Sequence, residues 1–323
     1  MKTLAKISFP LFPFLFSLGI AAAAEQYPSR PIRLIMPNAP GSSADTIGRI
    51  VAARLGEALG QQIVVDNRAG AGGVVGMEIG KNAIPDGYTL IATSYGALTV
   101  LPHVRKNLPY DAMRDFEYVA LYSRQGNVLV VNPALPVKSV RELIEYAKAR
   151  QGKLNMATAG VGAQSHLNGV GLMLAGKFES VHVPYKGGGP SMAAVIANEA
   201  QLSIAPSGAM MSHVRAGRLR AIGHTLPQRS PLLGDLPAIA ETLPGFKHVA
   251  FSGFLAPKGV PVPVVQKINA AVSRVVAASE MKEQLALQGA EPASATPEEF
   301  RRVVREVLAE TGKIVKAIGL KDE

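Results

Sequence analysis

Short apolar runs alternate with segments of helical periodicity along most of this chain. Residues 32–36 form the first apolar run, and from Ala44 onward apolar residues recur at positions 47, 50, 51, 55 and 59. This pattern predicts a buried strand followed by an amphipathic helix. Strand, glycine-rich turn and helix recur at "KLNMATAGVGAQSHLNGVGLMLAG" and at "VHVPYKGGGPSMAAVIANEA". Strands that alternate with helices indicate open α/β sheets that are mostly parallel.

Capping and turn residues mark the ends of further elements. Ser139, with Glu142 three residues later, opens the helical segment "VRELIEYAKAR", and Thr296 with Pro297 opens the last one. A Pro-Asp-Gly turn introduces an expected strand at 88–92. The 323 residues are enough for two ordinary domains of this alternating kind.

The first 24 residues differ from the rest of the chain. Lys2 and Lys6 precede the apolar stretch "ISFPLFPFLFSLGI", and "AAAA" then offers an A-x-A site. These features predict a secretory signal peptide at 1–24, cleaved between Ala24 and Glu25. A membrane anchor is the alternative, but the apolar stretch contains prolines and is shorter than the roughly 20 residues of a membrane span. We therefore expect an exported, periplasmic protein.

Composition and charge limit the chemistry further. The chain has no cysteine, which excludes disulfides, thiolate nucleophiles and cysteine-ligated metal sites. Its net charge of +10, or +8 without Lys2 and Lys6, fits either a field that attracts small anions or a merely solvated basic surface. The basic residues are dispersed, with no aromatic residues between them that could stack on bases, so nucleic-acid binding is not expected.

Three strand-to-helix turns have the composition of anion-binding sites: "NAPGSSAD", "TAGVGAQSH" and "PYKGGGPS". The first turn of a helix leaves backbone N–H groups unpaired at the positive end of the helix dipole. Glycine lets an anion approach these groups closely, and hydroxyls add donors. Plain capping, by Ser43 or Asp45 in the first turn, is the alternative for each of them. Because three such turns occur in one exported chain, a carboxylate-binding cleft is the favoured interpretation.

Other chemistries have weaker support in the sequence. "RAGAGGVVG" lacks the last glycine of a dinucleotide fingerprint, since position 75 is Val, and a turn with positive φ is the better interpretation. The histidines show no metal-ligand spacing, so we expect neither a metal nor a cofactor. A serine hydrolase that uses Ser165 beside His166, or Ser94, stays open as an alternative.

Several segments resemble a known family. "YPSRPIRLIMPNAPGSSAD", "VVDNRAGAGGVVG", "PDGYTL", "NLPYD", "VHVPYKGGGPS" and "GFLAPKGVP" are similar to the Bug (TctC-like) extracytoplasmic receptors of tripartite tricarboxylate transporter systems in Gram-negative bacteria. The similarity runs in order over essentially the whole mature chain, and "VHVPYKGGGP" is its most specific part.

The resemblance implies a periplasmic solute-binding receptor and not an enzyme. It implies a type II-like periplasmic binding protein with two α/β lobes, each a mostly parallel sheet flanked by helices, joined by two crossover strands. The first lobe would comprise residues 25–125 and 248–323, and the second residues 126–247. These lobes would close on a small organic carboxylate in a monomeric protein. The partner would be either the subunits of a membrane transporter or a sensor kinase, and the sequence leaves both open.

The ligand-binding residues follow from the motifs that match the family. The resemblance places Ala39, Gly41, Ser42 and Asp45 on one lobe, and Ala159, Gly160, Gly162, Ser165 and His166 on the other. It also places Ser94, Tyr185 and Gly187 at the cleft. We add Asn38 and Ser207, the second serine of "SIAPSG".

Departures from the family pattern bear on the ligand. The family often has Phe where this chain has Asn38, an aromatic residue where it has Ser252, and an acid where it has Ala205. Without the acid an ammonium group lacks a partner, which argues against an amino acid. The added polarity at Asn38 and Ser252 favours a hydroxylated or polycarboxylated acid.

Overall fold

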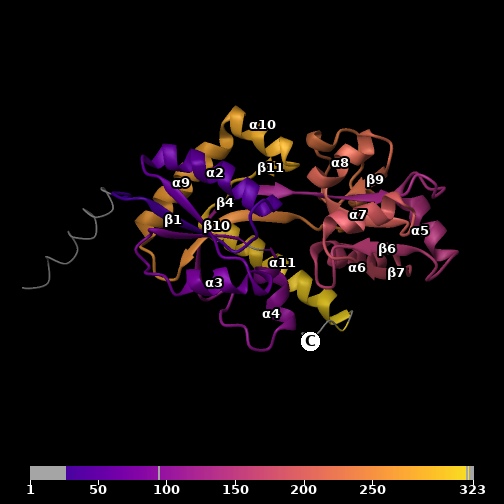
Figure 1. Ribbon diagram of the computed structural model, residues 1–323, viewed down its shortest axis with the longest axis horizontal. Helices are drawn as coiled ribbons and strands as arrows, with labels where there is room; N and C mark the ends of the chain where they lie inside the picture. The colour runs from indigo at the N-terminus through magenta and orange to yellow at the C-terminus, as the bar shows by residue number, and fades with distance from the viewer. Residues whose placement is uncertain (1–26, 94, 318, 320–323) are drawn as a thin grey trace, which may run out of the picture.

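The computed structural model describes residues 27–93, 95–317 and 319, which form two lobes around two separate sheets (Figure 1). The first sheet has six strands in the order β11-β4-β10-β3-β1-β2, and the second has five in the order β7-β6-β8-β5-β9. The first comprises β1 (Ile32–Met36), β2 (Ile63–Asn67), β3 (Thr89–Ala92), β4 (Phe116–Gln125), β10 (Ala250–Pro257) and β11 (Ala290–Pro292). The second comprises β5 (Asn127–Val131), β6 (Asn155–Thr158), β7 (Val181–Pro184), β8 (Leu202–Pro206) and β9 (Arg220–His224). The two-lobed α/β fold is thus confirmed.

Helices flank both sheets. Around the first sheet lie α2 (Ser43–Leu59), α3 (Val74–Lys81), α4 (Leu101–Val104), α9 (Val262–Ala277), α10 (Ser279–Leu287) and α11 (Pro297–Ala317). Around the second lie α5 (Val140–Lys148), α6 (Gln164–Gly176), α7 (Gly188–Ile196) and α8 (Ser207–Arg215). Short helical turns, η1 (Ala71–Gly73) and the π-helical η2 (Gly96–Val100), lie in the first lobe. None of the helices in the described part of the chain is long and apolar enough to cross a membrane.

The sheets are mixed, whereas the sequence predicted mostly parallel ones. Strands β1, β2 and β3 pair in parallel, but β10 runs antiparallel to both β3 and β4. In the second sheet β5 runs antiparallel to β8 and β9. The reason is that one chain segment leaves the first lobe and another returns to it, so the two joining segments must run in opposite directions.

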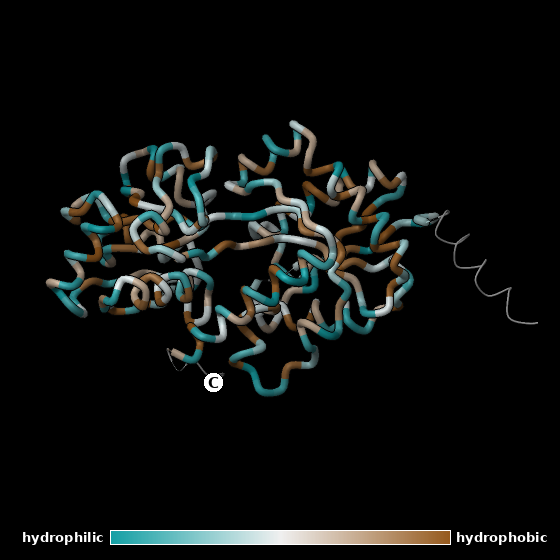
Figure 2. The backbone as a smooth tube through the Cα atoms, turned by 180° about the vertical axis from the view of Figure 1, so that it is seen from behind, coloured by the Kyte–Doolittle hydropathy of each residue, from teal (hydrophilic) through white to brown (hydrophobic). Residues whose placement is uncertain are grey.

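Each lobe is held by its own apolar core, formed where the sequence periodicity predicted. Ile47, Val51 and Leu55 on α2 are buried and belong to the same cluster as Leu34 of β1. The side chains that point inward from β1 therefore pack against the apolar face of α2, whose residues recur at helical spacing. Figure 2 shows the same arrangement along the tube, with apolar segments within both lobes and hydrophilic ones at their periphery.

Two strand connections join the lobes side by side. The chain passes from β4 to β5 at Gly126 and returns along β10, whose first residue, Ala250, pairs with Gln125. Thr225 ties the two connections together, because its Oγ1 accepts from the Asn127 N–H at 3.0 Å and donates to the His248 carbonyl at 2.5 Å. The hinge is therefore a two-stranded ribbon with a buried hydroxyl between its strands.

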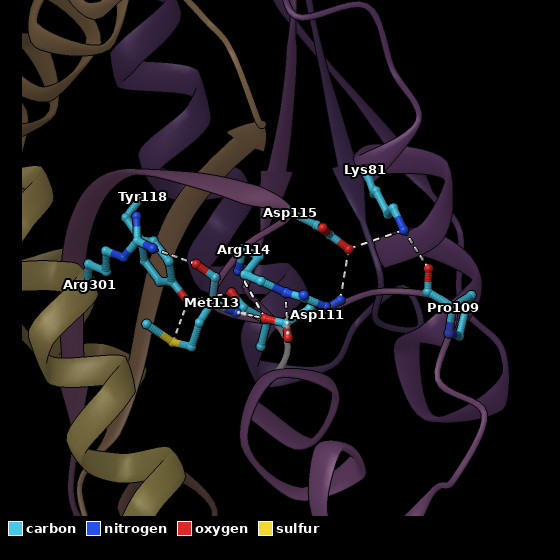
Figure 3. Close-up of polar contacts among 9 residues, drawn as sticks. Lys81, Pro109, Asp111, Met113, Arg114, Asp115, Tyr118 and Arg301 are labelled. Carbon is cyan, nitrogen blue, oxygen red and sulfur yellow. Dashed lines mark hydrogen bonds and ion pairs between the residues drawn. The ribbon is translucent and has the colours of Figure 1, made fainter.

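Helix α11 is anchored to the first lobe near its start. Arg301 donates to the Met113 carbonyl at 2.6 Å, and the ring of Phe300 packs edge-on against Tyr118. The loop that holds Met113 is itself fixed by Lys81, whose Nζ lies 3.1 Å from Asp115 Oδ2 and donates to the Pro109 carbonyl at 2.8 Å (Figure 3). The far end of α11 packs on the second lobe, where Ile314 and Val315 join an apolar cluster with residues of α6.

Candidate functional site

A cleft of about 480 Å³ lies between the lobes, in front of the hinge. The first lobe contributes the turn after β1, the glycine turn after β2 and the segment after β3, and the second contributes the turn before α6. These are the carboxyl ends of parallel strands, where open α/β sheets bind ligands. The lining residues that matter below are Asn38, Ala39, Ser43, Ala44, Gly70, Gly72, Gly73, Gln125, Gly162, Ala163, Gln164 and Ser252.

The first-lobe side of the cleft is the N-terminus of α2. Ser42 is the N-cap, and its side chain accepts from the Asp45 N–H at 3.3 Å. The N–H groups of Ser43 and Ala44 have no hydrogen-bond partner in the described part of the chain. Since both residues line the cleft, these two donors and the positive end of the helix dipole are available to a ligand.

Asp45 holds the turn rather than facing the cleft. Its buried carboxylate accepts from the Gly41 N–H at 2.9 Å, from Asn67 Nδ2 at 2.8 Å and from Arg49 Nε at 3.0 Å. Burial raises the pKa of Asp45, but the hydrogen bonds from Asn67, Gly41 and Arg49 outweigh burial and bring the pKa below its ordinary value. The carboxylate therefore stays ionised, and it already binds the Gly41 N–H, which is then not available to a ligand.

The second-lobe side of the cleft is built in the same way around the N-terminus of α6. Ser165 Oγ accepts from the Ala159 N–H at 2.9 Å, and His166 Nδ1 accepts from the Gly162 N–H at 3.1 Å. The N–H groups of Gln164 and Ser165, the first two residues of α6, find no acceptor among the described residues. Each lobe thus presents a helix N-terminus to the same cleft.

A pair of stacked imidazoles supports the second turn. The rings of His166 and His182 lie parallel, with centroids 3.8 Å apart, and His182 Nε2 is 2.6 Å from Thr158 Oγ1. Burial, together with the neighbouring His182, lowers the pKa of His166 to about 4. At neutral pH His166 is therefore uncharged, which leaves Nδ1 free to accept from Gly162.

Within the described part of the chain, no charged side chain lines the cleft. An anion that binds there must be neutralised by oriented backbone N–H groups and by neutral side chains. The geometry consequently suits a carboxylate and offers no acidic side chain to pair with an ammonium group.

The predicted site residues fall into three groups. Asn38, Ala39 and Gly162 line the cleft. Others shape the turns, with their polar atoms engaged inside the chain: Gly41, Ser42, Asp45, Ala159, Gly160, Ser165 and His166. Tyr185, Gly187 and Ser207 are also not among the lining residues: the Tyr185 N–H donates to the Thr158 carbonyl, Gly187 is the N-cap of α7, and Ser207 donates to the Gly289 carbonyl at 2.8 Å. Ser94 lies outside the described residues. Direct ligand contact by any of these residues stays a prediction.

Sequence reasoning missed part of the lining. The run Gly70, Gly72 and Gly73 does adopt positive φ, as expected, but it also forms a wall of the cleft. Gln125 and Gln164 line the cleft too, and neither was a candidate. A glycine turn after the second strand was the signal for the first group, and Gln164 lies within the predicted turn "TAGVGAQSH", whereas no sequence signal marked Gln125.

A catalytic arrangement is not supported. Ser165 and His166 each pair with a backbone N–H and not with each other. No group of three or more potential metal ligands occurs among the residues that the structure describes.

Comparison with known proteins agrees with this geometry. Residues 47–320 match the model of the tripartite tricarboxylate transporter family receptor. The chain belongs to this family. Protein BugT of Bordetella pertussis is 34% identical over 312 residues, which cover 95% of this chain and 96% of BugT.

Solved structures give the same result. A Rhodopseudomonas palustris protein solved with adipate has a TM-score of 0.79 and 31% identity, over 91% of this chain and 99% of that one. MatC from the same organism, with bound malate, has a TM-score of 0.73 and 30% identity, over 90% of this chain and 100% of MatC. This family receptor is therefore a periplasmic-type solute-binding protein and not an enzyme.

Replacing Asp45 by Asn should lower the free energy of unfolding by about 1–3 kcal/mol at pH 7, because hydrogen bonds to an ionised acceptor are lost. The pKa of Asp45 is lower in the folded chain than its ordinary value of 3.8. The stabilisation is therefore present above that value and disappears as the pH falls through the folded pKa. Urea unfolding of D45N and the unmodified protein at pH 7 and at pH 3 measures the difference. The exposed D235N variant serves as the control, and a gap between D45N and the unmodified protein that is no smaller at pH 3 than at pH 7 would contradict the assignment.

Proposed function

We propose that this receptor captures a small organic carboxylate between its lobes and closes on it. One observation supports this above all: two helix N-termini with unpaired N–H groups, one from each lobe, line one cleft that has no charged side chain among the described residues. A ligand that touches both lobes stabilises the closed form over the open one, and this difference is what a receptor reports. Closure would bring the unit 126–247 towards the unit 25–125 with 248–323.

The ligand is proposed to be a hydroxylated acid or one with several carboxylates. Relatives solved with adipate and malate support a dicarboxylate in general. Asn38 and Gln164 line the cleft from opposite lobes, and each has a buried side-chain atom without a hydrogen-bond partner among the described residues, Oδ1 and Nε2 respectively. Together with Ser252 they offer more hydrogen-bonding capacity than an aliphatic chain can use.

Export and delivery complete the proposal. A signal peptide at 1–24 would direct the protein to the periplasm, and its cleavage would leave Glu25 as the first residue. The closed receptor would then pass its ligand to the subunits of a membrane transporter of the tripartite tricarboxylate type, or present it to a sensor kinase.

Calorimetry of the mature protein with succinate, adipate, malate and citrate tests the ligand class. We expect saturable binding of at least one dicarboxylate or tricarboxylate, with malate tighter than succinate by about 1 kcal/mol for an added neutral hydrogen bond. Small-angle scattering should show a smaller radius of gyration with the ligand. Equal affinity for malate and succinate would refute the preference for a hydroxylated acid, and no binding by any carboxylate would refute the function.

A matched pair of substitutions at Ser43 tests the role of the backbone. Ser43 is the first residue of α2, where proline fits, and Ser42 before it is extended, as a residue preceding proline requires. Ser43→Pro removes an N–H that the helix does not use, together with the hydroxyl that lies 3.5 Å from Gln125 Oε1, so affinity should fall roughly tenfold to a hundredfold while stability is kept.

The variant Ser43→Ala keeps the N–H and loses the hydroxyl, and its affinity should stay within about threefold of the unmodified protein. Isothermal titration gives both dissociation constants, and thermal unfolding checks that both variants are folded. If Ser43→Pro binds as well as Ser43→Ala, the N-terminus of α2 does not hold the carboxylate.

A further inference from the structure

A second cavity, of about 360 Å³, lies behind the hinge. At the hinge, neighbouring residues line different spaces: on β4, Arg124 lines the rear cavity and Gln125 the front cleft, and at the start of β10, Val249 lines the rear and Ala250 the front. Successive side chains of a strand point to opposite faces. The two cavities therefore lie on opposite faces of the hinge ribbon.

The two walls of the rear cavity belong to different lobes. One wall is the α11 face formed by Val303, Val307 and Glu310, and α11 is anchored to the first lobe by Arg301. The other wall is a second-lobe segment that includes Leu226 and Lys247. Lys247 Nζ lies 3.6 Å from Glu310 Oε1, so an ion pair already spans the gap between the walls. A rotation of the lobes that moves the segment with Leu226 and Lys247 relative to the α11 face changes the width of this cavity.

The rear cavity and the front cleft share a partition. Tyr95 and Phe251 line both spaces, and their rings lie 6.0 Å apart between centroids. Because the hinge ribbon and this aromatic pair separate the two spaces, a rotation that widens the front cleft narrows the rear one. A molecule in the rear cavity would prevent that narrowing and so hold the front cleft towards its closed form.

The lining of the rear cavity indicates what would fit. Its lining is mixed, and its apolar part is formed by Leu226, Val249, Phe251, Val303 and Val307. Charged residues of both signs balance at the edge, with Arg124, Arg229 and Lys247 against Glu291, Glu306 and Glu310. A net charge of either sign would meet like charges, whereas an uncharged apolar body would be accepted. The volume is within the range of small-molecule sites.

We propose that the cavity behind the hinge is a second binding site, for a small uncharged molecule with an apolar body, and that its occupation raises the affinity of the front cleft for its carboxylate. This inference rests on the proposed function, since its effect is read at the carboxylate site. The coupling follows from the shared hinge and needs no contact between the two ligands.

The substitution Val307→Trp tests the coupling by placing an indole in the rear cavity from its own wall. The carboxylate dissociation constant should fall by about threefold or more, because the closed form gains population. Scattering without carboxylate should show a smaller radius of gyration. Ala309→Trp, exposed on the same helix and outside the cavity lining, is the matched control and should change neither quantity. The natural chain has no tryptophan, so the fluorescence emission of the introduced side chain shows directly whether the indole is buried.

Free indole tests the ligand class. At saturating concentration it should tighten carboxylate binding by the unmodified protein and by Ala309→Trp, and leave Val307→Trp unchanged. An unchanged or weaker affinity in a folded Val307→Trp variant with buried emission overturns the coupling. An unmodified protein that does not respond to indole overturns the proposed ligand. If the unmodified protein binds no carboxylate at all, the proposed function fails first, which separates the two failures.

Discussion

An anion in the cleft of this receptor has to be held by backbone N–H groups and neutral side chains, and this constraint explains most of the surrounding structure. No charged side chain of the described residues lines the cleft, so the attraction must come from the N-termini of α2 and α6. Backbone donors act only if the turns before the two helices keep a fixed shape. The polar side chains near the cleft serve that purpose.

The turns before α2 and α6 are both held in a fixed shape, but by different residues. In the first, the ionised carboxylate of Asp45 binds the Gly41 N–H, and Arg49 and Asn67 hold it in place. In the second, Ser165 and the neutral ring of His166 bind the N–H groups of Ala159 and Gly162. Each turn engages the donors that precede its helix and leaves the first donors of the helix itself free. An anionic ligand and the folded turn therefore do not compete for the same N–H groups.

The sequence predicted the local elements well, whereas it could not show which atoms the polar side chains of the turns bind within the chain. Ser139 caps α5 and Thr296 caps α11 as expected, because capping depends on neighbours in sequence. Asp45, Ser165 and His166 are predicted ligand contacts; in the described chain their polar atoms bind backbone N–H groups of their own turns, and direct contact with a ligand stays a prediction. The same residue types serve both purposes, so composition could not separate them. Gln125 was missed because only the folded chain brings it to the cleft, whereas Gln164 lies in a predicted turn but was not singled out within it. The mixed sheets were missed because strand direction depends on how the chain crosses the hinge.

A crystal structure of the mature protein with a bound dicarboxylate tests the central claim most directly. The account predicts that one carboxylate lies across the cleft, with its oxygens about 2.7–3.1 Å from the backbone N–H groups of Ser43 or Ala44 on one side and of Gln164 or Ser165 on the other, directly or through one ordered water. A carboxylate that is paired with a lysine or arginine side chain, or that contacts only one lobe, would contradict it.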